Sequence, residues 1–270
     1  MQKLVTPSLC IAALLLASSL AGQQREILLA TTTSTRDAGL LDSLLPLFES
    51  KTGYKINVVA VGTGQALEMA RRGDADVVLV HAPELERALV DSGYFVRRRL
   101  VMHNDFLLVG PANDPAKLRG NDAIAALRTI VSARARFVSR GDRSGTHMFE
   151  QKLWRLAGLT PPAPGGWYIE AGQGMAATLQ MADEMRAYTI TDRGTYLAWR
   201  PKLELVPLVE EDPPLDNVYH VMEVPRASAA ARALADFFVS SEAQALIGKF
   251  GTARFGRPLF VPDAGKPDRW

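Results

Sequence analysis

Residues 27–50 read ILLATTTSTRDAGLLDSLLPLFES, a short apolar run followed by hydroxyl residues and then by a stretch of helical period. The apolar residues 27–30 predict a strand. Leucines and a phenylalanine recur at core spacing between 40 and 48, so the pattern predicts a helix over 37–50 that ends at Gly53. A strand, a polar turn and a helix form the βα unit from which parallel-rich sheets are built, so this stretch predicts an α/β fold.

The same alternation of apolar run and amphipathic stretch continues along the chain. Further strands are predicted at 56–61, 77–80, 106–109, 137–138, 167–170, 187–191 and 204–209. Further helices are predicted from 65, from 84, over 122–134, over 146–157 and after 174. Two more helices between 227 and 250 are expected to pack back on the first half of the fold. Turn formers at Gly110-Pro111 and at 212–214 predict two crossings between lobes.

The start of the chain reads as an export signal. Lys3 precedes an apolar run over 9–20, and Ser19-Leu20-Ala21 offers a cleavage site, so residues 1–21 are a predicted signal peptide and the mature chain starts near Gly22. The run is too short to span a membrane. Cys10, the single cysteine, lies inside it and would be removed, which leaves no thiol for a disulfide or a metal. We therefore expect a periplasmic protein.

Size and charge narrow the function further. About 250 mature residues favour two lobes or one large α/β unit. The 31 lysines and arginines nearly balance the 29 aspartates and glutamates, so no nucleic-acid or charged-membrane partner is expected.

Three loops share a design that suits an anion. In each, a strand ends in small hydroxyl or glycine residues and a helix begins, which directs free N–H groups and the positive end of the helix dipole at one point. The first loop is the hydroxyl run 31–35, five residues where a helix cap needs only one. The second, Gly62-Thr63-Gly64-Gln65, is weak alone because such a strand end is often only a tight turn.

The third loop, SRGDRSGTH at 139–147, is the most informative. Its polar and small residues are Arg140, Asp142, Ser144, Gly145 and Thr146. The hydroxyls and the guanidinium are donors, the glycine lets the backbone approach a ligand, and the aspartate is placed to hold the arginine. A polar loop with an internal ion pair is the alternative interpretation. A fourth stretch, Gly172-Gln173-Gly174-Met175, is as consistent with a packing turn as with a ligand role.

Seven stretches in chain order span nearly the whole of the chain after the signal. They are TTTST at 31–35, GTGQAL at 62–67, DVVLVHAPE at 76–84, NDF at 104–106, SRGDRSGTH at 139–147, GQGM at 172–175 and TDRGTY at 191–196. Together they resemble the tungstate-binding proteins of ABC importers, which are related to molybdate and phosphate binders.

That resemblance implies a two-lobed, type II-like periplasmic binding fold with mixed sheets flanked by helices and a hinge of two strands. The crossings then place one lobe at 22–108 plus 217–270 and the other at 109–216. The implied ligand residues are Thr33, Ser34, Thr35, Thr63, Arg140, Ser144, Gly145 and Thr146, with support from Asp142, Gly174, Met175 and Thr191. The implied partners are a tungstate or molybdate ion and an ABC permease. We expect a monomer with no cofactor and no metal beyond the oxyanion.

The chemistry of the ligand fits these residue types. Tungstate near neutral pH is a dianion whose oxygens only accept hydrogen bonds, so hydroxyls, amides and one arginine suit it. Phosphate keeps a proton, which Asp142 could accept, so a phosphate-binding transport protein remains the alternative. An enzyme is not expected: Ser144 and His147 could suggest a hydrolase, but the sequence has no Gly-x-Ser-x-Gly turn. The other histidines have no metal-ligand spacing.

Overall fold

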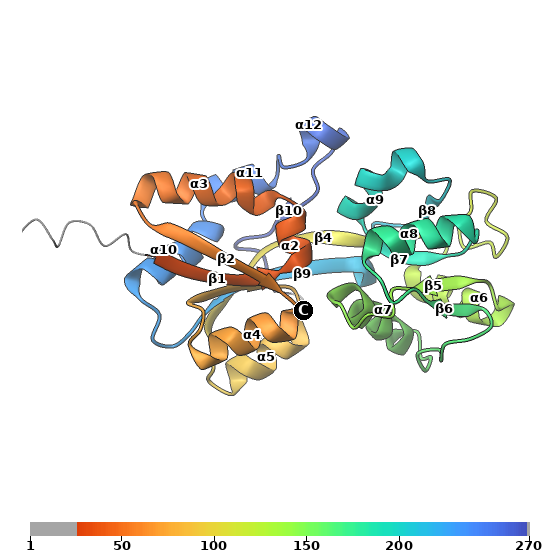
Figure 1. Ribbon diagram of the computed structural model, residues 1–270, viewed down its shortest axis with the longest axis horizontal. Helices are drawn as coiled ribbons and strands as arrows, with labels where there is room; N and C mark the ends of the chain where they lie inside the picture. The colour runs from red at the N-terminus through yellow and green to blue at the C-terminus, as the bar shows by residue number, and fades with distance from the viewer. Residues whose placement is uncertain (1–25, 269–270) are drawn as a thin grey trace, which may run out of the picture.

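The computed structural model describes residues 26–268, which fold into two lobes joined by two long strands (Figure 1). The predicted signal peptide, Cys10 and the start at Gly22 lie outside these residues. The main sheet has the order β10-β4-β9-β3-β1-β2, and β7 and β8 also pair with β4. The strands of the first lobe are β1 (Glu26–Thr32), β2 (Lys55–Val61), β3 (Val77–Val80), β4 (Val96–Gly110), β9 (Asp216–Glu223) and β10 (Val261–Pro262).

This sheet is mixed, as predicted. β1 pairs in parallel with β2 and β3, whereas β9 runs antiparallel to both β3 and β4. The surrounding helices are α2 (Thr33–Asp37), α3 (Leu40–Thr52), α4 (Thr63–Arg72), α5 (Pro83–Asp91), α10 (Ala229–Phe238), α11 (Ser241–Ile247) and α12 (Thr252–Phe255). The predicted α/β class, with its mixed sheet and flanking helices, is confirmed.

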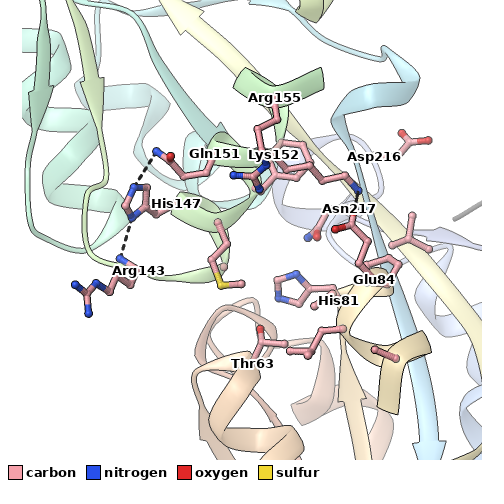
Figure 2. Close-up of a pocket in the computed structure, with 18 residues that line it drawn as sticks. Thr63, His81, Glu84, Arg143, His147, Gln151, Lys152, Arg155, Asp216 and Asn217 are labelled. Atoms are coloured by element: carbon pink, nitrogen blue, oxygen red, sulfur yellow. Dashed lines mark hydrogen bonds and ion pairs between the residues drawn. The ribbon is translucent and has the colours of Figure 1, made fainter. Parts of the chain in front are cut away.

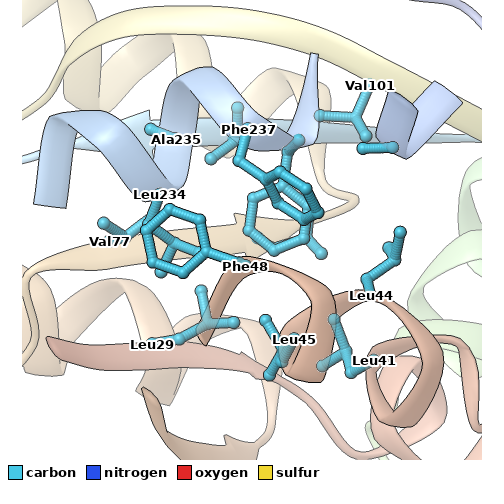
Figure 3. Close-up of a cluster of buried hydrophobic side chains, with 14 of the residues drawn as sticks. Leu29, Leu41, Leu44, Leu45, Phe48, Val77, Val101, Leu234, Ala235 and Phe237 are labelled. Atoms are coloured by element: carbon cyan, nitrogen blue, oxygen red, sulfur yellow. The ribbon is translucent and has the colours of Figure 1, made fainter. Parts of the chain in front are cut away.

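Alternation along the buried strands builds a core on each face of the sheet. Val77 of β3 packs with Leu29, Phe48 and Leu234 under α3 and α10 (Figure 3). Val78, the next residue along β3, belongs instead to the cluster on the opposite face under α4. The two C-terminal helices therefore pack on the first lobe, as the sequence predicted.

The first predicted helix is interrupted. Instead of one helix over 37–50 the chain forms α2 and α3, separated by Gly39, whose φ is 79°. Only glycine adopts this left-handed conformation at little cost, so the helix stops and restarts there.

The second lobe repeats the βα pattern around a smaller core. Its elements are α6 (Ala123–Ala133), β5 (Phe137–Ser139), α7 (Gly145–Leu156), β6 (Tyr168–Glu170), α8 (Met175–Glu184), β7 (Thr189–Asp192), α9 (Arg193–Trp199), a 3-10 turn η1 (Arg200–Lys202), β8 (Val206–Val209) and a second 3-10 turn η2 (Pro213–Leu215). Phe137, Trp154 and Tyr168 are fully buried at its centre, with their rings in contact.

The crossing between the lobes lies inside β4. This strand pairs with β9 as far as Asp105, opposite Asp216, and then pairs with β7 and β8 from Phe106 onward. The partner changes before Gly110-Pro111, where the turn-forming residues had suggested the crossing. The lobe boundaries predicted from the sequence, 22–108 plus 217–270 and 109–216, stay a proposal. The strand pairing favours a boundary at Asp105 on the first crossing strand.

Buried charges fix the second lobe to this crossing. The Arg193 guanidinium, at the start of α9, donates from Nε to Asp105 at 2.6 Å and from Nη1 to Glu210 at 2.7 Å.

Among residues 26–268, no helix has both the length and the apolar composition that a membrane crossing needs.

Candidate functional site

The helix starts of the two lobes meet across the gap between them. Thr63 is the first residue of α4 and Gly145 is the first residue of α7. A Cβ atom on Gly145 would lie 4.0 Å from Thr63 Oγ1 and 3.1 Å from His81 Cε1. Glycine therefore allows the second lobe to approach the first this closely, and two helix N-termini point their free amides toward the same region.

The hydroxyl run divides into structural and accessible members. Thr31 donates its hydroxyl to the Leu79 carbonyl at 2.7 Å, and Thr32 caps α2 by accepting from the Thr35 amide at 3.3 Å. Thr35 is fully buried, with its hydroxyl 2.6 Å from that of Thr32. Thr33 and Ser34 are exposed. Ser34 is therefore the member of the run best placed to meet a ligand.

A small cavity lies between the lobes and receives side chains from both. Ser34 lines it from the first lobe and Thr146 from the second. The remaining polar wall comes from the ends of β3 and β7 and from the two crossing strands β4 and β9, namely His81, Asp192, Asn104, Asn217 and Tyr219.

The crossing strands supply an ordered amide pair to this wall. Asn217 donates from Nδ2 to Asn104 Oδ1 at 2.7 Å, and the same Nδ2 lies 3.0 Å from the Tyr219 hydroxyl. Both amides are almost completely buried. Burial raises the pKa of Tyr219 far above its usual range, so its hydroxyl keeps its proton and remains a donor at any physiological pH.

In the loop 139–147, called the arginine loop below, Arg140 lies beside Thr146 and is held by Asp142. Arg140 donates from Nε to Asp142 at 2.8 Å, and its Nη1 lies 3.5 Å from Thr146 Oγ1. The other oxygen of Asp142 accepts from the Ser144 amide at 3.0 Å. Both carboxylate oxygens are thus occupied within the loop, which favours the ion-pair interpretation of Asp142 over a role as acceptor for a protonated ligand.

A buried carboxylate fixes the base of this loop. Glu150 of α7 accepts from the Ser139 hydroxyl at 2.7 Å, from Trp154 Nε1 at 3.0 Å and from the Tyr168 hydroxyl at 2.7 Å. Burial raises the pKa of Glu150, while these three donors act against that shift. The network ties the end of β5 to α7 and β6, and so holds both ends of the arginine loop.

The serine and histidine that suggested a hydrolase do not form a nucleophile and base. Ser144 is the N-cap of α7, and its hydroxyl accepts from the His147 amide at 3.4 Å. The His147 ring instead accepts from the Arg143 amide at 3.0 Å and contacts Gln151 at 3.1 Å (Figure 2). Across residues 26–268, no cluster of three or more metal-ligating side chains is found.

Three of the predicted supporting residues do not line the cavity between the lobes. Gly174 is exposed at the N-cap of α8, and Met175 packs in the second lobe among Val109, Val138 and Leu179. Thr191 is buried and donates its hydroxyl to the Asp192 carbonyl at 3.2 Å. The helix start at Met175 follows the predicted pattern, but its side chain contributes to the core.

His81 is one of the site residues that sequence reasoning missed, with Asn217 and Tyr219. It follows β3 directly, and its ring Nε2 lies 3.2 Å from Thr32 Oγ1 and 3.5 Å from Ser34 Oγ. The protein packed around the ring lowers the pKa of His81, against the opposing influence of Glu86, Asn217 and Asp192. Its position at the end of the apolar run 77–80 is the signal that could have found it, because the anion loops also begin at strand ends.

A second, larger cavity of about 790 Å³ opens beside the first (Figure 2). His81 lines both cavities, and Thr63 and Gly145 also line the larger one. Along its rim, Lys152 of α7 forms an ion pair at 3.2 Å with Glu84 of α5. This contact joins the two lobes.

Comparison with known proteins identifies relatives of the whole fold. A family profile described as a PBP superfamily domain matches residues 17–242. The tungstate-binding protein TupA of Peptoclostridium acidaminophilum is 50% identical over 249 residues, which cover 89% of this chain and 86% of the relative.

Solved structures agree with this likeness. The tungstate-binding protein TupA from Desulfovibrio alaskensis G20 superposes with a TM-score of 0.81 at 42% identity, covering 89% of this chain and 99% of that chain. The structure described as the tungstate ABC transporter from Geobacter sulfurreducens gives a TM-score of 0.72 at 46% identity, covering 85% of this chain and 100% of that one.

Proposed function

The chain belongs to the PBP superfamily and, within it, to the family of the TupA tungstate-binding proteins, and from this premise we propose that it captures tungstate for an ABC transporter. The anion binds between the lobes and is delivered to the permease. Molybdate, nearly equal to tungstate in size and charge, is the competing ligand of the same class. The function is capture and transfer, without a catalytic step.

One observation supports this proposal above the others: two helix N-termini from different lobes meet beside two adjoining cavities. Thr63 and Gly145 begin these helices and line the larger cavity, and Ser34 and Thr146 line the smaller one next to it. Amides and hydroxyls there donate hydrogen bonds, which a dianion without protons can only accept. Each hydrogen bond to a charged group contributes about 1.5–3 kcal/mol, so several of them offset the dehydration of the ion.

The proposed ligand set is a narrowed form of the predicted one. Ser34, Thr63, Gly145 and Thr146 supply direct donors, and Arg140 adds its guanidinium beside Thr146. The other predicted residues stay in the proposal as supports: Thr35 through its buried hydroxyl, Ser144 as the helix cap, Asp142 as the partner of Arg140, and Thr33 at the exposed start of α2.

The cellular setting follows from the predicted signal. The chain is exported through residues 1–21, is released near Gly22 and acts in the periplasm as a monomer. Closure of the lobes around the anion gives the form that the permease recognises.

Thermal unfolding tests this function on the mature chain. A ligand that binds only the folded state raises the melting temperature as the logarithm of its concentration increases. We expect this rise with tungstate, and none with sulfate at equal ionic strength. A rise with phosphate but not with tungstate would instead favour the phosphate-binding alternative.

A further inference from the structure

His81 lies where the two lobes meet and lines both cavities between them. It belongs to the first lobe, yet the start of α7 from the second lobe rests against it, since a Cβ on Gly145 would lie 3.1 Å from its Cε1. On its other side the ring packs against Tyr219, with 4.8 Å between ring centroids. A dianion between the helix starts of α4 and α7 would therefore lie beside this imidazole.

The hydrogen-bond partners of the ring allow it to change charge. Nε2 faces the hydroxyls of Thr32 and Ser34 at 3.2 and 3.5 Å. A hydroxyl can donate to a neutral ring nitrogen, or rotate and accept from a protonated one. No contact of the ring would have to break when a proton is added.

The charges around the ring are mixed when no anion is bound. Titratable and charged groups that line the two cavities or act on the ring come from α5 (Glu84, Glu86), from α7 and the loop before it (Arg143, His147, Lys152, Arg155), from β9 (Asp216, Tyr219) and from the start of α9 (Asp192). Asp192 accepts from the amide and the hydroxyl of Thr195 with its two oxygens, at 2.8 and 2.7 Å. Both carboxylate oxygens of Asp192 therefore already accept hydrogen bonds at the start of α9.

Burial opposes a positive ring and lowers the pKa of His81, against the opposing influence of Glu86, Asn217 and Asp192. A bound dianion reverses this balance, because an opposite charge nearby favours the imidazolium. Resting on the proposed function, we propose that His81 is a ligand-facing binding residue that gains a proton when tungstate enters the cavity.

The direction of the pH effect follows. The ring has a higher proton affinity in the complex than in the free protein, so tungstate binding takes up a proton and strengthens as pH falls. For one proton, the affinity changes by at most about tenfold per pH unit between the two pKa values.

Isothermal titration calorimetry with tungstate in two buffers of different ionisation enthalpy, PIPES and Tris, measures this proton directly. The mature wild type should take up a fraction of a proton at about pH 7.5, with affinity falling as pH rises. His81→Gln should bind one tungstate more weakly, with no proton uptake and a flat pH profile. His103→Gln is the matched control, because its ring bonds Asp263 and lines neither cavity; it should behave as wild type.

The outcomes separate this inference from the proposed function. Tight tungstate binding by the wild type without proton exchange, or unchanged uptake in His81→Gln, overturns the role of His81 and leaves the function standing. A wild type that binds no tungstate overturns both. If His81→Gln does not fold, the Cε1–H resonances of the four histidines of the wild type decide the question. Only that of His81 should shift its titration to higher pH when tungstate is bound.

Discussion

Arg140 is the residue whose role in the site is most sharply testable. Its guanidinium is held by Asp142 and lies beside Thr146, which lines the interlobe cavity. Hydrogen bonds between ionised partners are about twice as strong as neutral ones. Arg140→Ala should therefore reduce tungstate affinity at least about tenfold while the melting temperature of the free protein stays near that of the wild type.

Arg143 in the same loop is the matched control for this prediction. It is exposed at the edge of the larger cavity, and its backbone amide donates to the His147 ring (Figure 2). Arg143→Ala removes an equal charge from the same region. If both variants bind equally well in calorimetry, Arg140 has no special place in the site.

Ser144 separates helix capping from ligand binding. Its hydroxyl accepts the His147 amide at the start of α7, so Ser144→Ala should cost about 1 kcal/mol of stability and weaken binding less than Arg140→Ala does. Ser240→Ala, which removes the cap of α11 away from the site, should give a similar stability loss with unchanged binding. Urea unfolding combined with calorimetry distinguishes the two effects. A Ser144 variant that is destabilised but binds like wild type would confine this serine to capping.

For individual residues, the sequence predicted which loops form the site better than it predicted which side chains line the cavities. The strand-end pattern located Ser34, Thr63, Gly145 and Thr146, and the structure brings all four to the interlobe region. His81, Asn217 and Tyr219 were missed. His81 follows β3, and Asn217 and Tyr219 belong to β9, a strand that the local sequence pattern did not predict.

Among the elements, the break between α2 and α3 shows how one backbone angle shapes the site. Gly39 has a φ of 79°, so Gly39→Ala should destabilise the protein by about 1 kcal/mol or more, because alanine is strained in that conformation. Gly64 lies inside α4, and nothing lies within 4 Å of a Cβ placed there, so Gly64→Ala should be neutral or stabilising by about 0.5–1 kcal/mol. Equal losses of stability in urea unfolding would contradict the conformational explanation.

The C-terminal segment gives a pH-dependent contact with β4. His103 pairs with Asp263 at 2.5 Å, and this hydrogen bond raises the pKa of His103. A raised pKa in the folded state contributes stability below the unfolded value of about 6.5 that is lost as pH rises through the folded value. The melting-temperature difference between wild type and His103→Gln should therefore shrink from about pH 6 to pH 9. A difference that does not change with pH would exclude the charged histidine as its source.

The first half of β4 and the whole of β9 escaped prediction for a physical reason. The first half of β4 contains Arg97, Arg98 and Arg99, and β9 contains His220 and Glu223, which are polar residues that rarely indicate a buried strand. They are accommodated because their partners come from distant positions. Glu223 pairs with Arg99, and His220 lies 2.9 Å from Glu86. Local pattern cannot reveal such pairs.

For the whole molecule, the two lobes and their crossing strands favour a closing motion around the anion. Gly145 lies close to His81, and Lys152 pairs with Glu84, across the two lobes; we expect these contacts to stabilise a closed arrangement. Tungstate should increase the population of that arrangement and reduce the radius of gyration in small-angle X-ray scattering. Sulfate at equal ionic strength is the control. An unchanged radius with saturating tungstate would contradict closure as the response to binding.

The alternation of apolar runs and amphipathic stretches predicted an α/β fold, but it could not locate where the chain crosses between the lobes. Gly110-Pro111 marks a real turn, but the change of partner along β4 depends on which strands arrive from elsewhere, β9 before Phe106 and β7 with β8 after it. Overall architecture was thus accessible from periodicity and resemblance, whereas the exact hinge required the pairing of distant segments.

The central claim is selective capture of tungstate, and calorimetric titration of the mature chain with tungstate, molybdate, phosphate and sulfate at one pH and salt concentration tests it most directly. The account predicts tight one-to-one binding of tungstate, with no comparable response to phosphate or sulfate. Preference for phosphate, or no heat with any of the four anions, would contradict it.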